Sequence, residues 1–371
     1  MALKNEFEPA DVARRLADWL PGALGVAGPV TVDDVVIPQA SGMSSETVLF
    51  RASWTGDDGP VTRGLVVRVP PAIGLFPDPD VTREAATMRA LAAHADAPVP
   101  DVLAHETSGD VLGGEFLLLE RAHGDVPGDD PPFVTGGWVV DLPAERRGVM
   151  YDGALRAIAG IQAVDVDATG LASLHDGSTA DAVLEREIGY WREFYAWARA
   201  ADGQSPLVER ALDRLEETRP SLDGPLVPVW GDARFGNMMF GPDQQVTAVL
   251  DWEMASVGPR EVDLGYWLFF DRMYSEGIGA PRLEGFPERD AVIARYTELT
   301  GHEPRHLDWF EAWGALRGSI LLVRVGNLMI EHGLMPPGAP FPVSNPAAHV
   351  LAALLELPPP DADAAWITGS R

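Results

Sequence analysis

The chain of 371 residues carries 56 Asp and Glu against 28 Lys and Arg, and its formal net charge is −28. This acidic balance disfavours a nucleic-acid partner, which needs a basic face. The absence of cysteine excludes disulfides, thiolate nucleophiles and cysteine-ligated metal centres.

The sequence also limits the kinds of site and compartment to consider. Lys4 is the only lysine, which excludes a Walker-type nucleotide site because that motif requires a lysine. The length allows two lobes, each with its own core. No apolar run approaches the roughly 18 residues of a membrane span, and no export signal is seen, so we expect a cytoplasmic protein without membrane contact.

The amino-terminal part combines strands with two helices. Apolar residues at helical spacing predict an amphipathic helix over residues 9–20. Short β-branched segments then predict three strands, a second helix and two further strands. The three strands lie at 30–37, 46–54 and 64–70, the second helix at 82–94, and the last two strands at 99–107 and 115–121.

The composition changes after residue 124. Residues 124–143 are rich in glycine, proline and aspartate, which predicts a linker or loop insertion. The rest is predicted to be helical, apart from a strand-containing stretch at 226–251. The expected helices are 145–164, 180–202, 205–219, 261–275, 289–300 and 306–332. The expected parts of the chain are an amino-terminal lobe at 1–120, a hinge and loop insertion at 121–143, a helical carboxy-terminal lobe at 144–357 and a disordered tail at 358–371.

One short string resembles a zinc-hydrolase motif. His302-Glu-Pro-Arg-His306 matches H-E-x-x-H, which works only when both histidines lie on one face of one helix. Pro304 lies between them, and proline is accepted in the first turn of a helix but disrupts its interior. We therefore expect Pro304 to begin the next helix and to leave His302 outside it, which disfavours zinc hydrolysis.

The stretch VWGDARFGNMMF at 229–240, with the strand after it, carries the candidate chemistry. Asp232 lies in a loop, Asn237 comes five residues later, and Asp251 ends the next strand. Phosphoryl transfer to a hydroxyl needs a carboxylate that accepts the hydroxyl proton, and oxygen ligands that hold Mg²⁺. Asp232 alone would be a turn residue. The three residues together predict a catalytic Asp232, with Asn237 and Asp251 as Mg²⁺ ligands.

The order Gly231-Asp232, four residues, Asn237, then Asp251-Trp252 resembles the aminoglycoside phosphotransferase family, whose motifs are His-Gly-Asp-x4-Asn and Asp-Trp or Asp-Phe. The most similar branch includes the kinase-like domains attached to acyl-CoA dehydrogenases. The resemblance covers roughly residues 35–275.

The resemblance implies a two-lobed α+β fold like that of protein kinases. Its small lobe would hold a five-stranded antiparallel sheet plus a helix, and its large lobe would be mainly α-helical. The implied activity is transfer of the γ-phosphoryl group of ATP, with Mg²⁺, to a hydroxyl of a small molecule.

The resemblance also assigns nucleotide-binding residues to the amino-terminal half. Arg68 stands where kinases keep a lysine, and Glu84 is its expected ion-pair partner. Arginine is permanently charged and binds a carboxylate well, so the replacement is workable. The expected nucleotide contacts are Ser41, Gly42, Met43, Ser44 and Ser45 of a phosphate-covering loop, Arg68 with Glu84, and Glu120 and Arg121 of the hinge.

Two positions depart from the family pattern. Trp230 replaces a histidine, and we expect it to brace the catalytic loop by packing, since its side chain offers a single N–H donor. Arg68 replaces the lysine. These departures leave an alternative open, in which the protein is a weak or inactive pseudokinase that binds a nucleotide or metabolite. Asp263 is expected to brace the catalytic loop, and Glu253 either assists the metal or faces solvent.

Two kinds of acceptor fit the sequence. The acidic balance suits a cationic, aminoglycoside-like compound. The 125–143 segment, with Phe133 and Trp138, would instead form an apolar lid that favours a macrolide-like or other apolar alcohol.

Overall fold

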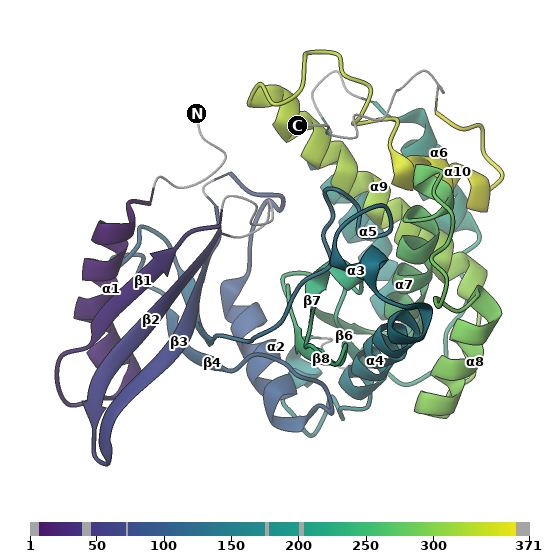
Figure 1. The fold of residues 1–371 in the computed structure, drawn as a ribbon. Helices are drawn as coiled ribbons and strands as arrows, with labels where there is room; N and C mark the ends of the chain where they lie inside the picture. Colours follow the sequence, from purple (N-terminus) through teal and green to yellow (C-terminus); the bar gives the residue numbers. More distant parts are fainter. Residues whose placement is uncertain (1–6, 39–45, 72, 175–177, 200–203, 361–371) are drawn as a thin grey trace. The chain divides into compact units, whose positions relative to one another are not determined.

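The computed structural model describes residues 7–38, 46–71, 73–174, 178–199 and 204–360 (Figure 1). The chain divides into two compact units. The amino-terminal unit comprises residues 1–92 and 99–122, and the carboxy-terminal unit comprises residues 93–98 and 123–371. Most of the predicted tail, from residue 361 onward, lies outside the described residues.

The amino-terminal unit is built on a five-stranded sheet. Its strands are β1 (Thr31–Val36), β2 (Glu46–Gly56), β3 (Gly59–Val69), β4 (Val102–Glu106) and β5 (Phe116–Glu120). They lie in the order β1-β2-β3-β5-β4, and every neighbouring pair is antiparallel. The predicted five-stranded antiparallel sheet is therefore confirmed.

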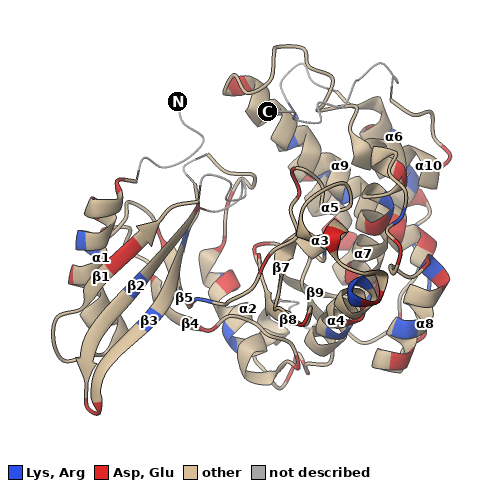
Figure 2. Ribbon diagram, in the orientation of Figure 1, with Lys and Arg blue, Asp and Glu red and all other residues tan. Residues whose placement is uncertain are grey.

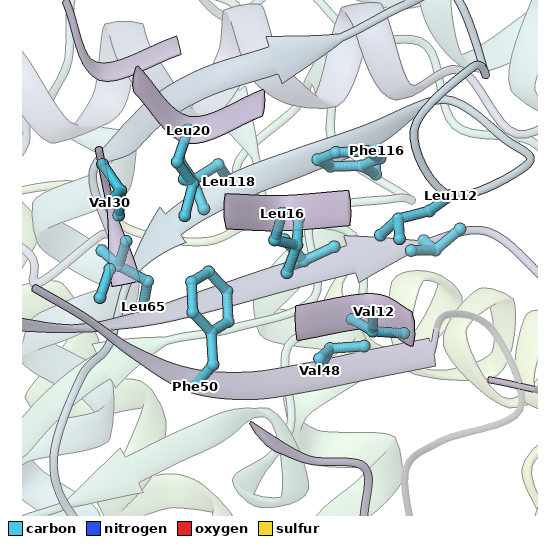
Figure 3. Packing of buried hydrophobic residues seen from close by; sticks show 13 residues of the cluster. Val12, Leu16, Leu20, Val30, Val48, Phe50, Leu65, Leu112, Phe116 and Leu118 are labelled. Atoms are coloured by element: carbon cyan, nitrogen blue, oxygen red, sulfur yellow. The ribbon is translucent and has the colours of Figure 1, made fainter. Parts of the chain in front are cut away.

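Helix α1 (Pro9–Leu24) covers one face of this sheet (Figure 3). Val12, Leu16 and Leu20 recur every four residues and are fully buried, as the helical period requires. They pack with inward-facing strand residues such as Phe50 and Leu118. The helix extends past its predicted end at residue 20 and closes at Gly25, whose left-handed φ of 65° suits glycine.

The strand alternation of β3 places a charged residue on the opposite face from α1. Val67 and Val69 are buried in the core beneath α1, so Arg68 between them points to the other side. Helix α2 (Val81–His94) supplies Glu84, which forms an ion pair with Arg68. Arg68 lies on the face opposite α1 because side chains alternate with a period of two along the strand. The ion pair needs neither cysteine nor lysine.

The carboxy-terminal unit is mainly helical (Figure 1). Its helices are α3 (Trp138–Asp141), α4 (Ala144–Gln162), α5 (Ala180–Ala198), α6 (Pro206–Glu217), α7 (Glu261–Met273), α8 (Arg289–Thr300), α9 (Leu307–Glu331) and α10 (Pro346–Leu354). The same unit contains two small antiparallel strand pairs. They are β6 (Val227–Val229) with β9 (Ser256–Gly258), and β7 (Met238–Phe240) with β8 (Val246–Val249).

Several further details differ from the sequence predictions, among them the start of β3 at Gly59 rather than residue 64. Helix α9 begins at Leu307 rather than Pro304, because His306 adopts the left-handed conformation that stops a helix from starting earlier. The predicted loop insertion contains the short helix α3. Helix α10 was not predicted, although Asn345 caps it by accepting from Ala348 N–H at 3.0 Å.

Acidic side chains lie on elements of both units (Figure 2). The charge is therefore a property of the surface as a whole rather than of one binding face. In the described part of the chain, every helix is too short or too polar to span a bilayer.

Candidate active site

The loop between β6 and β7 brings Asp232 and Asn237 into direct contact. Asn237 Nδ2 donates to Asp232 Oδ2 at 2.5 Å and to the Asp232 carbonyl at 3.2 Å. Because its nitrogen is turned to Asp232, the carbonyl oxygen of Asn237 is the end that suits a cation. The carboxylate and the amide thus hold each other in one orientation, as a phosphoryl-transfer loop needs.

Asp251 lies two residues after the end of β8 and is tied to the same loop. Its φ of 61° is left-handed, a conformation that aspartate tolerates better than most residues. The preceding Leu250 donates its N–H to the Asn237 carbonyl at 2.8 Å. Asn237 and Asp251 therefore lie on two connected loops of one unit. Their hard oxygen donors fit Mg²⁺.

Trp230 lies beneath both loops. Its side chain is fully buried, and Nε1 donates to the Leu250 carbonyl at 2.9 Å and to the Asp251 carbonyl at 3.2 Å. The indole therefore joins the loop of Asp232 to the loop of Asp251 by packing and hydrogen bonding. Glu253 is half-buried in the turn that follows Asp251.

Asp263, at the start of α7, braces the loop from below. Its carboxylate accepts the N–H of Trp230 at 2.9 Å and that of Gly231 at 2.8 Å, and Gln162 donates at 3.3 Å. Burial raises the pKa of Asp263, and these hydrogen bonds oppose that effect. Gly231 has a φ of 91°, and a Cβ there would overlap the carbonyl of Met254, so the position requires glycine.

Arg317 of α9 holds the other side of Gly231. Its Nη2 donates to the Gly231 carbonyl at 2.9 Å. The guanidinium lies 5.1 Å from the ring centre of Trp191 and 4.8 Å from that of Tyr266. Burial, and then the charge of Asp232, raise the pKa of the Tyr266 hydroxyl. Sequence reasoning missed Arg317, because nothing local links it to the loop.

Arg234 is the second residue that sequence reasoning missed. Its Nε contacts Asp232 Oδ2 at 3.1 Å and its Nη1 contacts Asp129 Oδ2 at 2.7 Å. The side chain is largely buried, and the charges of Asp232 and Asp129 outweigh burial and raise its pKa. The position of Arg234 two residues after the candidate base could have indicated a role in the site. Nothing in the sequence linked Asp129 to this loop.

A cavity of about 20 Å³ adjoins Arg234, enough for one water molecule. Its walls are mainly aromatic, and its charged members are Arg234, Asp271 and Arg282. Phe133 from the predicted lid segment lies in this cluster, with its ring 5.4 Å from Phe235. Trp138 lies elsewhere, against Phe240.

The structure describes some, but not all, of the predicted nucleotide-binding residues of the amino-terminal unit. Arg68 Nη1 lies 3.9 Å from Glu84 Oε1, and both side chains are largely buried. The backbone N–H groups of Glu120 and Arg121 are bonded within the unit, to Asp101 and Gly64 carbonyls. The predicted loop of Ser41, Gly42, Met43, Ser44 and Ser45 lies outside the described residues.

The zinc-like string does not form the helix that a zinc hydrolase needs. His302 Nε2 lies 2.9 Å from Glu261 Oε1, whereas His306 sits at the beginning of α9. Within the described ranges, no group of three His, Asp or Glu side chains is arranged to hold a metal ion.

Solved structures share this fold. A candidate aminoglycoside phosphotransferase from Ralstonia eutropha is 22% identical, with a TM-score of 0.65 over 92% of this chain and 95% of that one. A thermostable mutant of an aminoglycoside phosphotransferase, bound to ADP and hygromycin B, is 18% identical, with a TM-score of 0.54 over 92% and 98%. A macrolide 2′-phosphotransferase from Brachybacterium faecium is 20% identical, with a TM-score of 0.51 over 95% and 100%. These likenesses confirm the kinase-like fold.

Curated relatives are longer proteins. Acyl-CoA dehydrogenase family member 10 of Mus musculus is 31% identical over 282 residues, which are 75% of this chain and 24% of that protein. Family member 11 of Rattus norvegicus is 25% identical over 321 residues, 82% of this chain and 39% of that protein. This chain therefore spans a quarter to two fifths of their length. The model of the phosphotransferase enzyme family matches residues 36–302, and the chain belongs to that family.

Proposed function

We propose that this phosphotransferase moves the γ-phosphoryl group of ATP, with Mg²⁺, to a hydroxyl of a small molecule. The observation that carries the proposal is the contact of Asp232 with Asn237 on a loop tied to Asp251. In the reaction the acceptor oxygen forms a bond to the γ-phosphorus, and the bond from that phosphorus to the β–γ bridging oxygen breaks. The acceptor hydroxyl proton passes to Asp232, and ADP leaves.

Each residue has a role set by its chemistry. Asp232 orients the acceptor hydroxyl and receives its proton. Asn237 and Asp251 would hold Mg²⁺, whose charge, when bound, offsets that of the phosphates. Arg68, kept in place by Glu84, would bind phosphate oxygens.

The remaining nucleotide contacts come from two backbone segments. Residues 41–45 would cover the phosphates with backbone amides. Glu120 and Arg121 would meet adenine through their carbonyls, since their N–H groups are already bonded within the unit.

The proposed acceptor is a small molecule with a hydroxyl, of either the aminoglycoside-like or the macrolide-like class. The aromatic cavity beside Arg234 has room for about one water molecule, so it does not itself accommodate an acceptor. Its charged members are Arg234, Arg282 and Asp271, and the acidic surface is spread over both units, so neither feature selects one class.

Thermal unfolding with Mg·ATP tests the nucleotide site. A ligand that binds only the folded state raises stability by about 2.7 kcal/mol at a hundred times its Kd. We expect a rise in the midpoint that EDTA abolishes and that Asp251→Asn removes. Asp243→Asn is the matched control, because it makes the same change at an exposed residue of the β7–β8 turn.

Transfer itself is tested with a panel of hydroxyl compounds. Asp232→Asn should bind Mg·ATP normally and lose about a hundredfold or more in turnover, because the proton acceptor is gone. Full turnover in Asp232→Asn would contradict the assignment of the base. Mg·ATP binding without transfer to any acceptor or to water would favour the pseudokinase alternative.

A further inference from the structure

We propose that Asp129 is a positioning residue for phosphoryl transfer, which holds Arg234 so that its guanidinium does not close on Asp232. The proposal rests on the proposed function of Asp232. It adds a residue from a distant segment, 105 positions away in the sequence from its partner, that the loop motif does not contain.

The Arg234 guanidinium is shared between two carboxylates. Nε reaches Asp232 Oδ2 at 3.1 Å, while Nη1 reaches Asp129 Oδ2 at 2.7 Å. A guanidinium can bind one carboxylate with two parallel N–H groups, and such a bidentate pair is strong. In this structure the two contacts go to different residues, and the shorter one goes to Asp129.

Asp129 is itself held by Tyr274, the residue that follows α7. The hydroxyl of Tyr274 donates to Asp129 Oδ1, so both carboxylate oxygens are engaged. Burial alone would raise the pKa of Asp129, but the charge of Arg234 and the Tyr274 hydroxyl lower it. Asp129 is therefore ionised at neutral pH and presents a full counter-charge to Arg234.

The segment that carries Asp129 is anchored on both sides. Before it, Asp125 exchanges two backbone hydrogen bonds of 2.9 Å with Phe240. After it, Phe133 is 2% exposed, and its ring lies 4.9 Å from that of Tyr274. Gly236 passes so close that a Cβ there would lie 2.8 Å from Asp129 Oδ1. The Asp129 side chain is 50% exposed, but these contacts and its bonds to Arg234 and Tyr274 fix its position.

The consequence concerns the proposed base. Without a carboxylate at position 129, the buried guanidinium needs another counter-charge, and Asp232 is the carboxylate already beside it. A bidentate pair would occupy both oxygens of Asp232 and compete with the acceptor hydroxyl. That pair would use Nε and Nη2, so Asp129 opposes it by holding Nη1 and keeping the guanidinium from turning fully toward Asp232.

The experiment compares Asp129→Asn with Asp125→Asn, which removes the same charge from an exposed side chain of the same segment. Hydrolysis of Mg·ATP, with water as acceptor, is the readout that needs no identified substrate. We expect turnover of Asp129→Asn to fall about ten- to a hundredfold. Its KM for Mg·ATP should stay within about twofold, because only the reacting hydroxyl is displaced. Asp129→Glu should restore part of the loss.

A double variant tests whether Asp129 acts through Arg234. In an Arg234→Gln background, Asp129→Asn should add little, because the group that it controls is absent. Independent, multiplicative losses would overturn the proposal. Equal turnover in Asp129→Asn and Asp125→Asn would overturn it as well.

The thermal shift of the unmodified protein with Mg·ATP tests the proposed function independently of Asp129, and no shift would mean that the proposed function fails. Even in that case a crystal structure of Asp129→Asn decides the positional claim. Two contacts between Arg234 and Asp232 would support it, and an unchanged single contact would overturn it.

Discussion

At the scale of single residues, the site is a set of polar groups that hold one another in a mostly apolar unit. Asp232, Asn237 and Asp263 each accept or donate to a neighbour that is fixed by packing. Such groups are costly when unpaired, and well paired they hold one orientation. At Asp271, beside the aromatic cavity, burial outweighs the stabilisation of the charged form by its partners.

Burial raises the pKa of Asp271 from 3.8 to about 6, although Arg282 and the Tyr151 hydroxyl lower it in part. The folded state therefore binds this proton more tightly than the unfolded chain does. Its contribution favours folding below about pH 4 and is lost as the pH rises to 6, a change of about 3 kcal/mol in the free energy of unfolding.

Asp271→Asn does not titrate, so this slope should disappear from its profile. Urea unfolding at several pH values between 4 and 7 measures the free energy of unfolding of both proteins. The value for the unmodified protein minus that for Asp271→Asn should fall as the pH rises. Asp290→Asn, at an exposed carboxylate of α8, should keep the original slope. Parallel profiles for Asp271→Asn and the unmodified protein would show that Asp271 has an ordinary pKa.

At the scale of elements, the crossing of α7 and α9 sets the position of the loop that carries Asp232. A Cβ at Gly265 would lie 2.5 Å from the Phe310 backbone, and one at Gly314 would lie 3.0 Å from the Tyr266 backbone. These glycines let the two helices approach closely. Asp263 on α7 and Arg317 on α9 then reach the two sides of Gly231.

Arg317→Met should lower the free energy of unfolding by about 3 kcal/mol, because it leaves the buried Gly231 carbonyl without its charged donor and removes the guanidinium from the rings of Trp191 and Tyr266. Arg317→Lys keeps the charge but loses the planar stacking on Trp191 and Tyr266, so it should restore only part. Denaturant unfolding measures both variants.

Arg324→Met is the matched control for this helix. Arg324 also lies over a ring, that of Trp197 at 4.3 Å, but its neighbours are not those of the loop. We expect a smaller loss of stability there. Similar losses at both arginines would mean that α9 needs its cations in general and that Gly231 is not the reason.

At the scale of the whole molecule, the net charge of −28 makes repulsion between surface carboxylates a general cost. The Debye length falls from about 30 Å at 0.01 M salt to about 10 Å at 0.1 M. Added NaCl should therefore raise the thermal midpoint at neutral pH. The effect should vanish near the sequence pI of about 4.5, where little net charge remains. A midpoint that falls with NaCl at neutral pH would show that screened ion pairs outweigh the repulsion.

Much of the secondary structure was predictable, because it depends on patterns within a few residues. The period of 3.6 located α8 at 289–300 without error, and the period of two located β2 and the later part of β3, whose first five residues were missed. Helix α10 was missed although Asn345 and Pro346 are a start signal, since its short Ala-rich sequence has little amphipathic pattern. The start of α9 was misplaced because Pro304 permits a helix to begin but does not require it.

The residues of the candidate site also form two groups, those that local sequence patterns predict and those that only the tertiary structure assigns. Taken alone, the sequence predicted Asp232, Asn237 and Asp251, since loop spacing brings neighbours in the chain together. It also predicted that Arg68 and Glu84 would pair, through the family resemblance. Asp129 and Arg317 could be assigned to the loop only from the tertiary structure. They approach it from a distant segment and a distant helix, and side-chain packing between remote parts of a chain leaves no periodic or local trace in the sequence.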